Sequence, residues 1–226
     1  MLTEKGTLNT EVIFNESKTE RYLLRKVWDD KPIVSLIMTN PSIADVVSVD
    51  MTTLYVINNL YRLGEYGGVD ILNMTSQITS KVDTKNGITL SDVNAEYILK
   101  SCETSDKVIL AFGRIGENSK KIRHVIMKLL DTLTPFQDKL YMIASDAGDC
   151  LFHPLAPQVR FSWHLIPFVP PEYLQEKPES KPENQASDKS EDKSENQWLK
   201  NLEERSEDES EKSTDEKPAR RTRKIS

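Results

Sequence analysis

Short apolar runs separated by polar turns predict the strands of this chain. Continuous or alternating apolar residues favour strands over residues 10–15, 20–28, 33–38, 69–75, 107–113 and 139–145. The first two runs are joined by the polar turn NESKT and are expected to form an N-terminal β-hairpin. The run at 33–38, IVSLIM, is almost wholly apolar, which is typical of a strand covered on both faces.

Between the later strands, the apolar residues recur with helical spacing. Helices are predicted over residues 50–64, 91–103 and 116–133, with Asp50 and Ser91 as N-caps and Gly64 as a C-cap. Strands that alternate with helices indicate right-handed crossovers and a parallel sheet. We therefore expect an α/β fold: a three-layer α/β/α domain around a central, mainly parallel four-stranded sheet, preceded by the hairpin.

Composition divides the chain near residue 175. Residues 1–174 carry the apolar runs and predict one domain, whereas residues 176–226 hold 15 acidic and 12 basic residues and very few apolar ones. Such a segment buries too little surface to offset the entropy of ordering it, so residues 175–226 are expected to be a disordered, charged low-complexity tail. Within it, Asn196–Arg205 contains the tail's only aromatic residue and two leucines, and is a candidate for folding on a protein partner.

Charge and cysteine content narrow the function classes. The net charge of −6 argues against non-specific nucleic-acid binding, which relies on a basic surface. The N-terminus has no apolar signal-peptide core, and no run approaches the length of a membrane span. Cys102 and Cys150 are too few for a disulfide framework and are typical of buried thiols in a reducing compartment. We expect a cytoplasmic protein with no membrane contact.

Polar residues follow four of the predicted strands. They are Asn40-Pro41-Ser42, Asn73, Phe112-Gly113-Arg114 and His153-Pro154-Leu155, in chain order. The carboxyl ends of parallel strands meet at one edge of a sheet, where ligands bind in open α/β folds. The sequence therefore predicts a pocket at this edge. The alternative interpretation of each segment is a turn with side-chain capping or, for His153, a loop histidine beside prolines.

These residues, in this order, resemble the motifs of the uracil-DNA glycosylase superfamily. Asn40-Pro41-Ser42 resembles its first motif, Asp-Pro-Tyr-His or Asn-Pro-Gly; Asp70-Ile71-Leu72-Asn73 resembles a Leu-Leu-Asn strand end; Phe112-Gly113 resembles a Trp-Gly; and His153-Pro154-Leu155 resembles a His-Pro-Ser-Pro loop. The chain looks still more like a bacterial and phage domain family with Asn-Pro-Ser-x-Ala-Asp and His-Pro-Leu motifs, here residues 40–45 and 153–155. The resemblance covers about residues 20–160.

The resemblance implies a protein that recognises a modified or mismatched DNA base and hydrolyses its N-glycosidic bond after the nucleotide is flipped from the stack. Asn40, whose amide can orient water, and His153, which as a neutral imidazole can stabilise the leaving base, are the candidate catalytic residues. Asn73 offers both a donor and an acceptor to a base edge. The other candidate base-binding residues are Pro41, Ser42 and Tyr55, and further pocket candidates are Asp45, Asp50, Phe112 and Gly113.

Two weaker patterns concern phosphate and metal. Arg114, Ser119 and Lys120 stand near the start of a predicted helix, where they could contact a phosphate, although the segment lacks the P-loop and Rossmann spacings. Asp146, Asp149, Cys150 and His153 match no standard zinc spacing, so we expect no metal, and nothing calls for an organic cofactor.

Three functions remain open. The first is the glycosylase. The second is a non-catalytic protein that binds a base, a nucleotide or DNA as a phage or defence accessory factor, since Asn40 stands where many superfamily enzymes carry an aspartate and no stacking phenylalanine follows the motif. The third is a Rossmann-like nucleotide-handling domain. All three make nucleic acid or a nucleotide the expected partner.

Overall fold

A computed structural model describes residues 1–79, 81–82, 87–145 and 150–175 of the chain. The described residues belong to one compact unit. The expected tail, apart from Gln175, and its candidate partner segment Asn196–Arg205 therefore lie outside the described residues.

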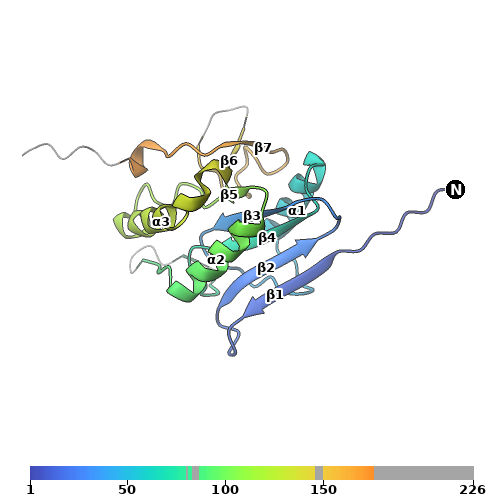
Figure 1. The fold of residues 1–226 in the computed structure, drawn as a ribbon, viewed down its shortest axis with the longest axis horizontal. Coiled ribbons are helices and arrows are strands. Elements are labelled where there is room, and N and C mark those ends of the chain that lie inside the picture. Colours follow the sequence, from blue (N-terminus) through green and yellow to red (C-terminus); the bar gives the residue numbers. More distant parts are fainter. Residues whose placement is uncertain (80, 83–86, 146–149, 176–226) are drawn as a thin grey trace, which may run out of the picture. The chain divides into compact units, whose positions relative to one another are not determined.

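One mixed sheet organises the described residues, with seven strands in the order β1-β2-β4-β3-β5-β6-β7 (Figure 1). The strands are β1 Asn9–Phe14, β2 Arg21–Val27, β3 Ile33–Met38, β4 Gly68–Asn73, β5 Val108–Leu110, β6 Leu140–Ala144 and β7 His164–Pro167. The pairs β4–β3, β3–β5 and β5–β6 are parallel, and β1–β2, β2–β4 and β6–β7 are antiparallel.

The mixed α/β class agrees with the expectation, but the expected four-stranded, mainly parallel sheet is wrong. The N-terminal hairpin is not a separate appendage, because β2 pairs with β4 and so extends the same sheet. At the other edge β7 pairs with β6, although no strand was predicted there. Its four residues, HLIP, are too few to show an alternation and end in proline, which is tolerated only at sheet edges.

Each α-helix of the described residues begins at a side-chain cap, whereas neither 3-10 helix has one. These elements are α1 Met51–Leu63, α2 Asp92–Thr104, α3 Lys120–Thr132, and the short 3-10 helices η1 Thr134–Lys139 and η2 Glu172–Leu174. Asp50 accepts a hydrogen bond from the Thr53 amide at 2.6 Å, and Gly64 ends α1 with a φ of 74°, both as predicted. The predicted start of α3 at residue 116 is wrong: Ser119 is its N-cap, and the residues before it form turns.

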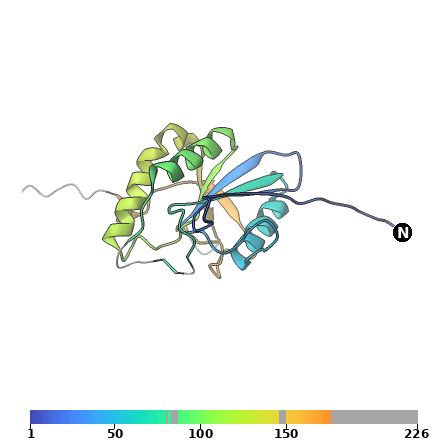
Figure 2. The same cartoon turned by 90° about the horizontal axis from the view of Figure 1, so that it is seen from below.

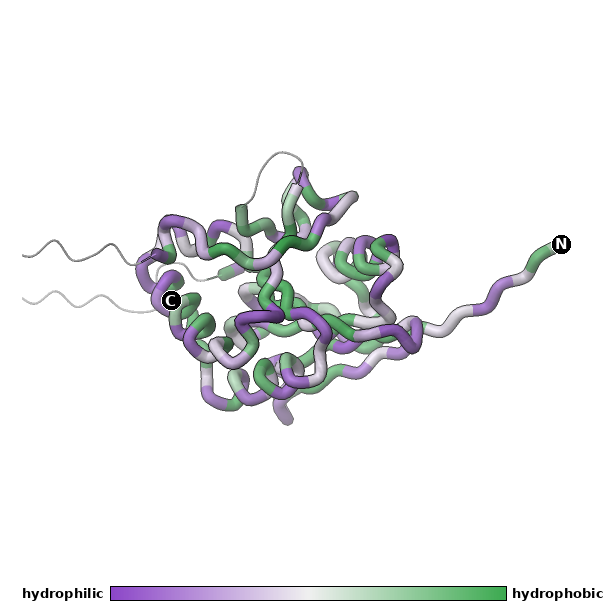
Figure 3. The backbone as a smooth tube through the Cα atoms, turned by 45° about the horizontal axis from the view of Figure 1, so that its top comes forward, coloured by the Kyte–Doolittle hydropathy of each residue, from purple (hydrophilic) through white to green (hydrophobic). Residues whose placement is uncertain are grey.

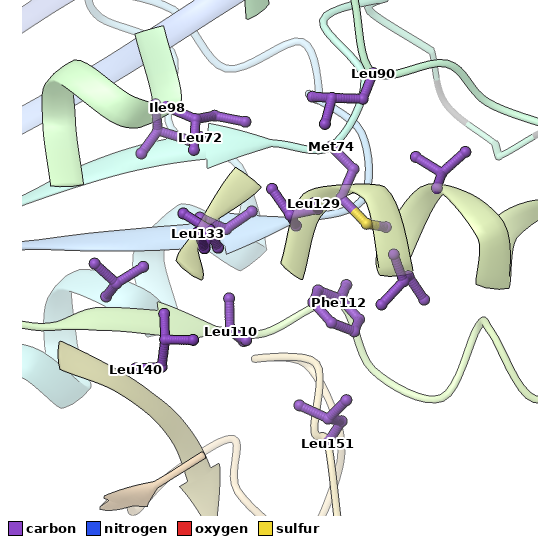
Figure 4. Packing of buried hydrophobic residues seen from close by; sticks show 14 of the residues in the cluster. Leu72, Met74, Leu90, Ile98, Leu110, Phe112, Leu129, Leu133, Leu140 and Leu151 are labelled. Carbon is purple, nitrogen blue, oxygen red and sulfur yellow. The ribbon is translucent and has the colours of Figure 1, made fainter. Parts of the chain in front are cut away.

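Helices cover both faces of the sheet (Figure 2). On one face α2 and α3 pack on a core that includes Leu72, Leu110 and Leu129 (Figure 4). On the other, α1 packs on a core that includes Ile71, Ile109 and Val56. Neighbouring residues of one strand thus serve opposite cores, because side chains alternate along a strand. The hydrophobic colouring in Figure 3 follows these central strands. In the described part of the chain, no helix has both the length and the apolar character that crossing a bilayer requires.

Candidate functional site

The loop after β3 is held against the segment after β4. The Asn40 side-chain amide donates to the Thr79 carbonyl oxygen at 2.7 Å and approaches its hydroxyl at 3.3 Å. The carbonyl of the buried Pro41 accepts from the Thr79 amide at 3.3 Å. The amide nitrogen of Asn40 therefore joins two loops. Its role as an orienter of water would fall to its side-chain oxygen.

A small pocket of about 40 Å³ lies where this loop meets α1 and the segment after β6. It is lined by Arg21, Met38, Asn40, Ser42, Asp50, Thr52, Thr53 and His153. Four of these, Asn40, Ser42, Asp50 and His153, were candidates from the sequence. The volume suits one or two water molecules or one edge of a ligand, and it is smaller than a whole base.

Asp50 supplies the carboxylate of this pocket. Its side chain caps α1 through the Thr53 amide and also interacts with the Ser42 and Thr53 hydroxyls. Burial alone would raise the pKa of Asp50, but these hydrogen bonds and the positive charge of Arg21 leave it below its usual value. Asp50 is thus both a helix cap and an ionised pocket residue.

His153 supplies the imidazole. Burial lowers the pKa of His153, an effect that the charge of Asp50 only partly offsets. Its Nδ1 accepts from the Leu155 amide at 3.2 Å, which assigns the proton of the neutral ring to Nε2. Gly113, with φ of 69°, packs against this histidine: a Cβ added there would lie 3.3 Å from the Cβ of His153. The ring therefore enters the pocket as a neutral donor.

Arg21 is the buried cation of the site, and it is 2% exposed. It donates to the Ala44 carbonyl at 2.8 Å, to the Ser42 carbonyl at 3.5 Å and to Asn73 Oδ1 at 3.4 Å. Burial lowers its pKa to about 10, although the charge of Asp50 acts in the opposite direction. Arg21 thus ties the end of β4 to the loop that leads to Asp50.

Asn73 lies behind Arg21, at the end of β4, and is 1% exposed. Its backbone oxygen accepts from the Asn94 side chain of α2 at 2.8 Å. Within the described residues, its side-chain nitrogen has no hydrogen-bond partner. The expected base reader is therefore deeply buried and connected to the pocket through Arg21.

The remaining candidates do not line this pocket. Asp45 is exposed and accepts from the Val47 and Ser48 amides, which lower its pKa, so it is a loop anchor. Tyr55 packs edge-on against Phe161 with ring centroids 5.6 Å apart, and Phe112 is buried in the core beside α3.

The candidate phosphate residues do not line this pocket either. Arg114 is exposed and pairs with Glu117 at 2.6 Å, Ser119 caps α3, and Lys120 is exposed. Asp146 and Asp149 lie outside the described residues. Within the described ranges, no cluster of three or more His, Cys, Asp or Glu side chains is close enough to hold a metal ion.

Sequence reasoning missed Arg21, Met38, Thr52 and Thr53. Arg21 did carry a signal, because it alternates with Leu23 on the core-facing side of a strand, where a charge requires a reason. Thr52 also carried a signal, because Asp50-Met51-Thr52 matches an Asp-x-Thr motif of the bacterial and phage domain family that the chain resembles. Thr53 had none, since it reads as the first turn of a helix.

Among curated proteins and among solved structures, none matches the chain. One family model matches residues 21–155, a segment that begins at Arg21 and includes His153. The chain therefore belongs to the family described as "Protein of unknown function (DUF1643)".

Proposed function

We propose that this pocket recognises a modified or mismatched base of DNA and that its residues hydrolyse the N-glycosidic bond of that base. The observation that carries the proposal is the pairing of Asp50 and His153 on one pocket. The first is held ionised, and the second is held neutral with its proton on Nε2.

The chemistry needs these two states. As the bond breaks, positive charge develops on the sugar and negative charge on the leaving base. The Asp50 carboxylate would stabilise the sugar cation and orient the attacking water, which an amide at Asn40 cannot deprotonate. His153 Nε2–H would donate to the departing base. Water oxygen bonds to C1′, the bonding electrons leave with the base, and the water's proton returns to the base.

The size of the pocket limits how a base would bind. At about 40 Å³ it would take one edge of the ring, with the rest of the flipped nucleotide at its mouth. The motif resemblance supports this placement, because Asn40, Ser42 and His153 come from two of the resembling segments.

A second candidate is recognition without hydrolysis. The Asp50 carboxylate already accepts from Thr53 and interacts with Ser42, which weakens it as a base. On this alternative the pocket binds a base or nucleotide and releases it unchanged.

Base release from labelled oligonucleotides tests the two. Substrates would carry uracil, hydroxymethyluracil, mismatched thymine or hypoxanthine, and alkali-labile sites would be scored. We expect cleavage by the wild type, loss of at least about a hundredfold in Asp50→Asn and His153→Ala, and no loss in Asp45→Asn. Asp45→Asn is the matched control, because it removes an exposed carboxylate of the same loop. Saturable binding without cleavage would favour the second candidate. The absence of both binding and cleavage would remove both candidates.

A further inference from the structure

Arg21 brings a positive charge into the protein without a matching ion pair. It is 2% exposed, and among the described residues no carboxylate lies within 4 Å of its guanidinium. Two of its nitrogens donate to protein oxygens, but Nε has no partner among the described residues. Buried donors in native proteins are almost always satisfied, and Arg21 lines the pocket. An acceptor atom of a bound ligand would satisfy Arg21 Nε.

The neighbouring side chain, Asn73, also has an unpartnered donor within the described residues. Arginine can only donate, so its bond to Asn73 fixes the amide with Oδ1 toward Arg21. The group that remains on Asn73 is Nδ2, which is buried and has no partner in the described part of the chain. Asn73 was expected to offer a base both a donor and an acceptor, but Arg21 already uses the acceptor. Nδ2 is a donor like Arg21 Nε, but Asn73 does not line the pocket, so Arg21 is the one of the two side chains that a ligand there would meet.

The charge of the pocket limits which acceptor fits. Asp50 lines the same pocket and is ionised, so an anionic ligand group beside Arg21 would also lie close to a carboxylate. A neutral carbonyl oxygen accepts hydrogen bonds without that repulsion. An amino group brings a donor to a donor and would leave Arg21 Nε unsatisfied.

We propose that Arg21 is the specificity-determining residue of this pocket, and that it selects neutral heterocycles presenting a carbonyl oxygen while rejecting those with an amino group at that position. This inference rests on the proposed base recognition in taking the ligand to be a base, but it does not require hydrolysis. It extends that function by naming the chemistry of the edge that is read.

Binding of two free nucleosides tests it directly. Inosine and adenosine differ at one exocyclic position, where the first has a carbonyl oxygen and the second an amino group. Calorimetric titration of the full chain should show inosine bound at least about tenfold more tightly, in line with the discrimination that a good hydrogen-bonded contact to a base edge provides.

Variants assign the preference to Arg21. Arg21→Met should bind the two nucleosides within about twofold of each other. Arg21→Lys keeps the charge but lacks the planar set of donors, so its preference should also fall, and it serves if the methionine variant fails to fold. Arg123→Met is the matched control. Arg123 is a half-buried arginine that donates to the Gly116 and Glu117 carbonyls and does not line the pocket, so its loss should leave the preference unchanged.

The outcomes separate this inference from the proposed hydrolysis. A preference for inosine with no base release from any oligonucleotide would leave the inference standing and remove the hydrolytic function. Base release combined with equal affinity for the two nucleosides would leave the hydrolytic function standing and remove the inference. Equal affinity, preference for adenosine, binding of neither, or an unchanged preference in Arg21→Lys would each overturn the inference.

Discussion

Two arginines of strand β2 each bind a polar residue of strand β4, but only the Arg25–Asp70 pair is an ion pair. Arg25 binds Asp70 through two hydrogen bonds of 2.6 and 2.7 Å. Arg21 binds Asn73 through one bond of 3.4 Å. The hydrogen bonds to Asp70 raise the pKa of Arg25, whereas burial lowers that of Arg21 to about 10.

Helix α2 contributes to a hydrogen-bonded cluster around Asp70, the Asp70 cluster, whose other members are Arg25, Ser35, Ser101 and Ser105. Ser101 donates to Asp70 at 2.7 Å and lies 2.6 Å from the Ser35 hydroxyl, which in turn lies 2.8 Å from Ser105. Neither carboxylate oxygen of Asp70 lacks a partner, and the cluster joins β2, β3, β4 and α2. Around Arg21, by contrast, two donors remain unpartnered within the described residues. A satisfied polar cluster holds a fold together, whereas an unsatisfied one beside a pocket points to a ligand.

The largest effect should come from breaking the satisfied cluster. Asp70→Ala removes the buried carboxylate that Arg25 and Ser101 share, and we expect the free energy of unfolding to fall by about 3 kcal/mol in urea denaturation. Glu11→Ala is the control: Glu11 also faces Arg25, but at 3.8 Å and with 57% of its side chain exposed, so it should change stability by about 0.5 kcal/mol at most. Equal effects of the two would contradict the structural role of the Asp70 cluster.

Gly64 and Gly113 both have positive φ, and of these two only Gly113 contacts the pocket histidine. Gly113→Ala and Gly64→Ala both place an alanine in left-handed backbone, and each should lower stability by about 1 kcal/mol. Only at Gly113 does the new methyl group press on His153, whereas no atom lies within 4 Å at Gly64. We expect Gly113→Ala alone to weaken nucleoside binding or base release. Full function in that variant would show that the position of His153 is unimportant.

Substitutions of Asp50 separate its cap from its charge. Asp50→Ala should destabilise the protein by about 1 kcal/mol, while Asp50→Asn retains a good N-cap and should be nearly neutral in thermal unfolding. Both remove the pocket carboxylate, so both should lose base release. Ser91→Ala, which removes the cap of α2 at a similar cost, should leave base release intact. An active Asp50→Asn enzyme would remove the carboxylate from the mechanism.

The smallest effect concerns pH. The pKa of His153 is lower in the folded protein than its usual 6.5, so the unfolded chain binds more protons just below that value. The stabilising contribution is present above pH 6.5 and is lost as the pH falls through the lowered folded pKa. His153→Asn should therefore flatten the fall in stability below pH 6.5, measured by urea denaturation at several pH values. An unchanged slope would show that the histidine is not buried as a neutral group.

The local features of the chain were predictable because they depend on neighbouring residues. Asp50 caps α1, Ser91 caps α2 and Gly64 ends α1, and each acts on backbone groups no more than three residues away. The apolar runs likewise identified the central strands. The strand-end segments Asn40-Pro41-Ser42 and His153-Pro154-Leu155 were recognisable as candidate site residues for the same reason.

The role of those residues depends on contacts between segments that are distant in the sequence. The place of β2 beside β4 brings Arg21 to the pocket, from 52 residues before its partner Asn73. The path of the chain after β4 brings Thr79 to the Asn40 amide. Asp50 and His153 are far apart in the sequence, yet they line the same pocket. Strand order and loop path depend on how the whole core packs, and a local pattern does not contain that information. The caps, the central strands and the candidate polar groups can thus be predicted from local sequence. Their assembly into one pocket, with Arg21 Nε and Asn73 Nδ2 beside it and unpartnered within the described residues, depends on the fold of the whole chain.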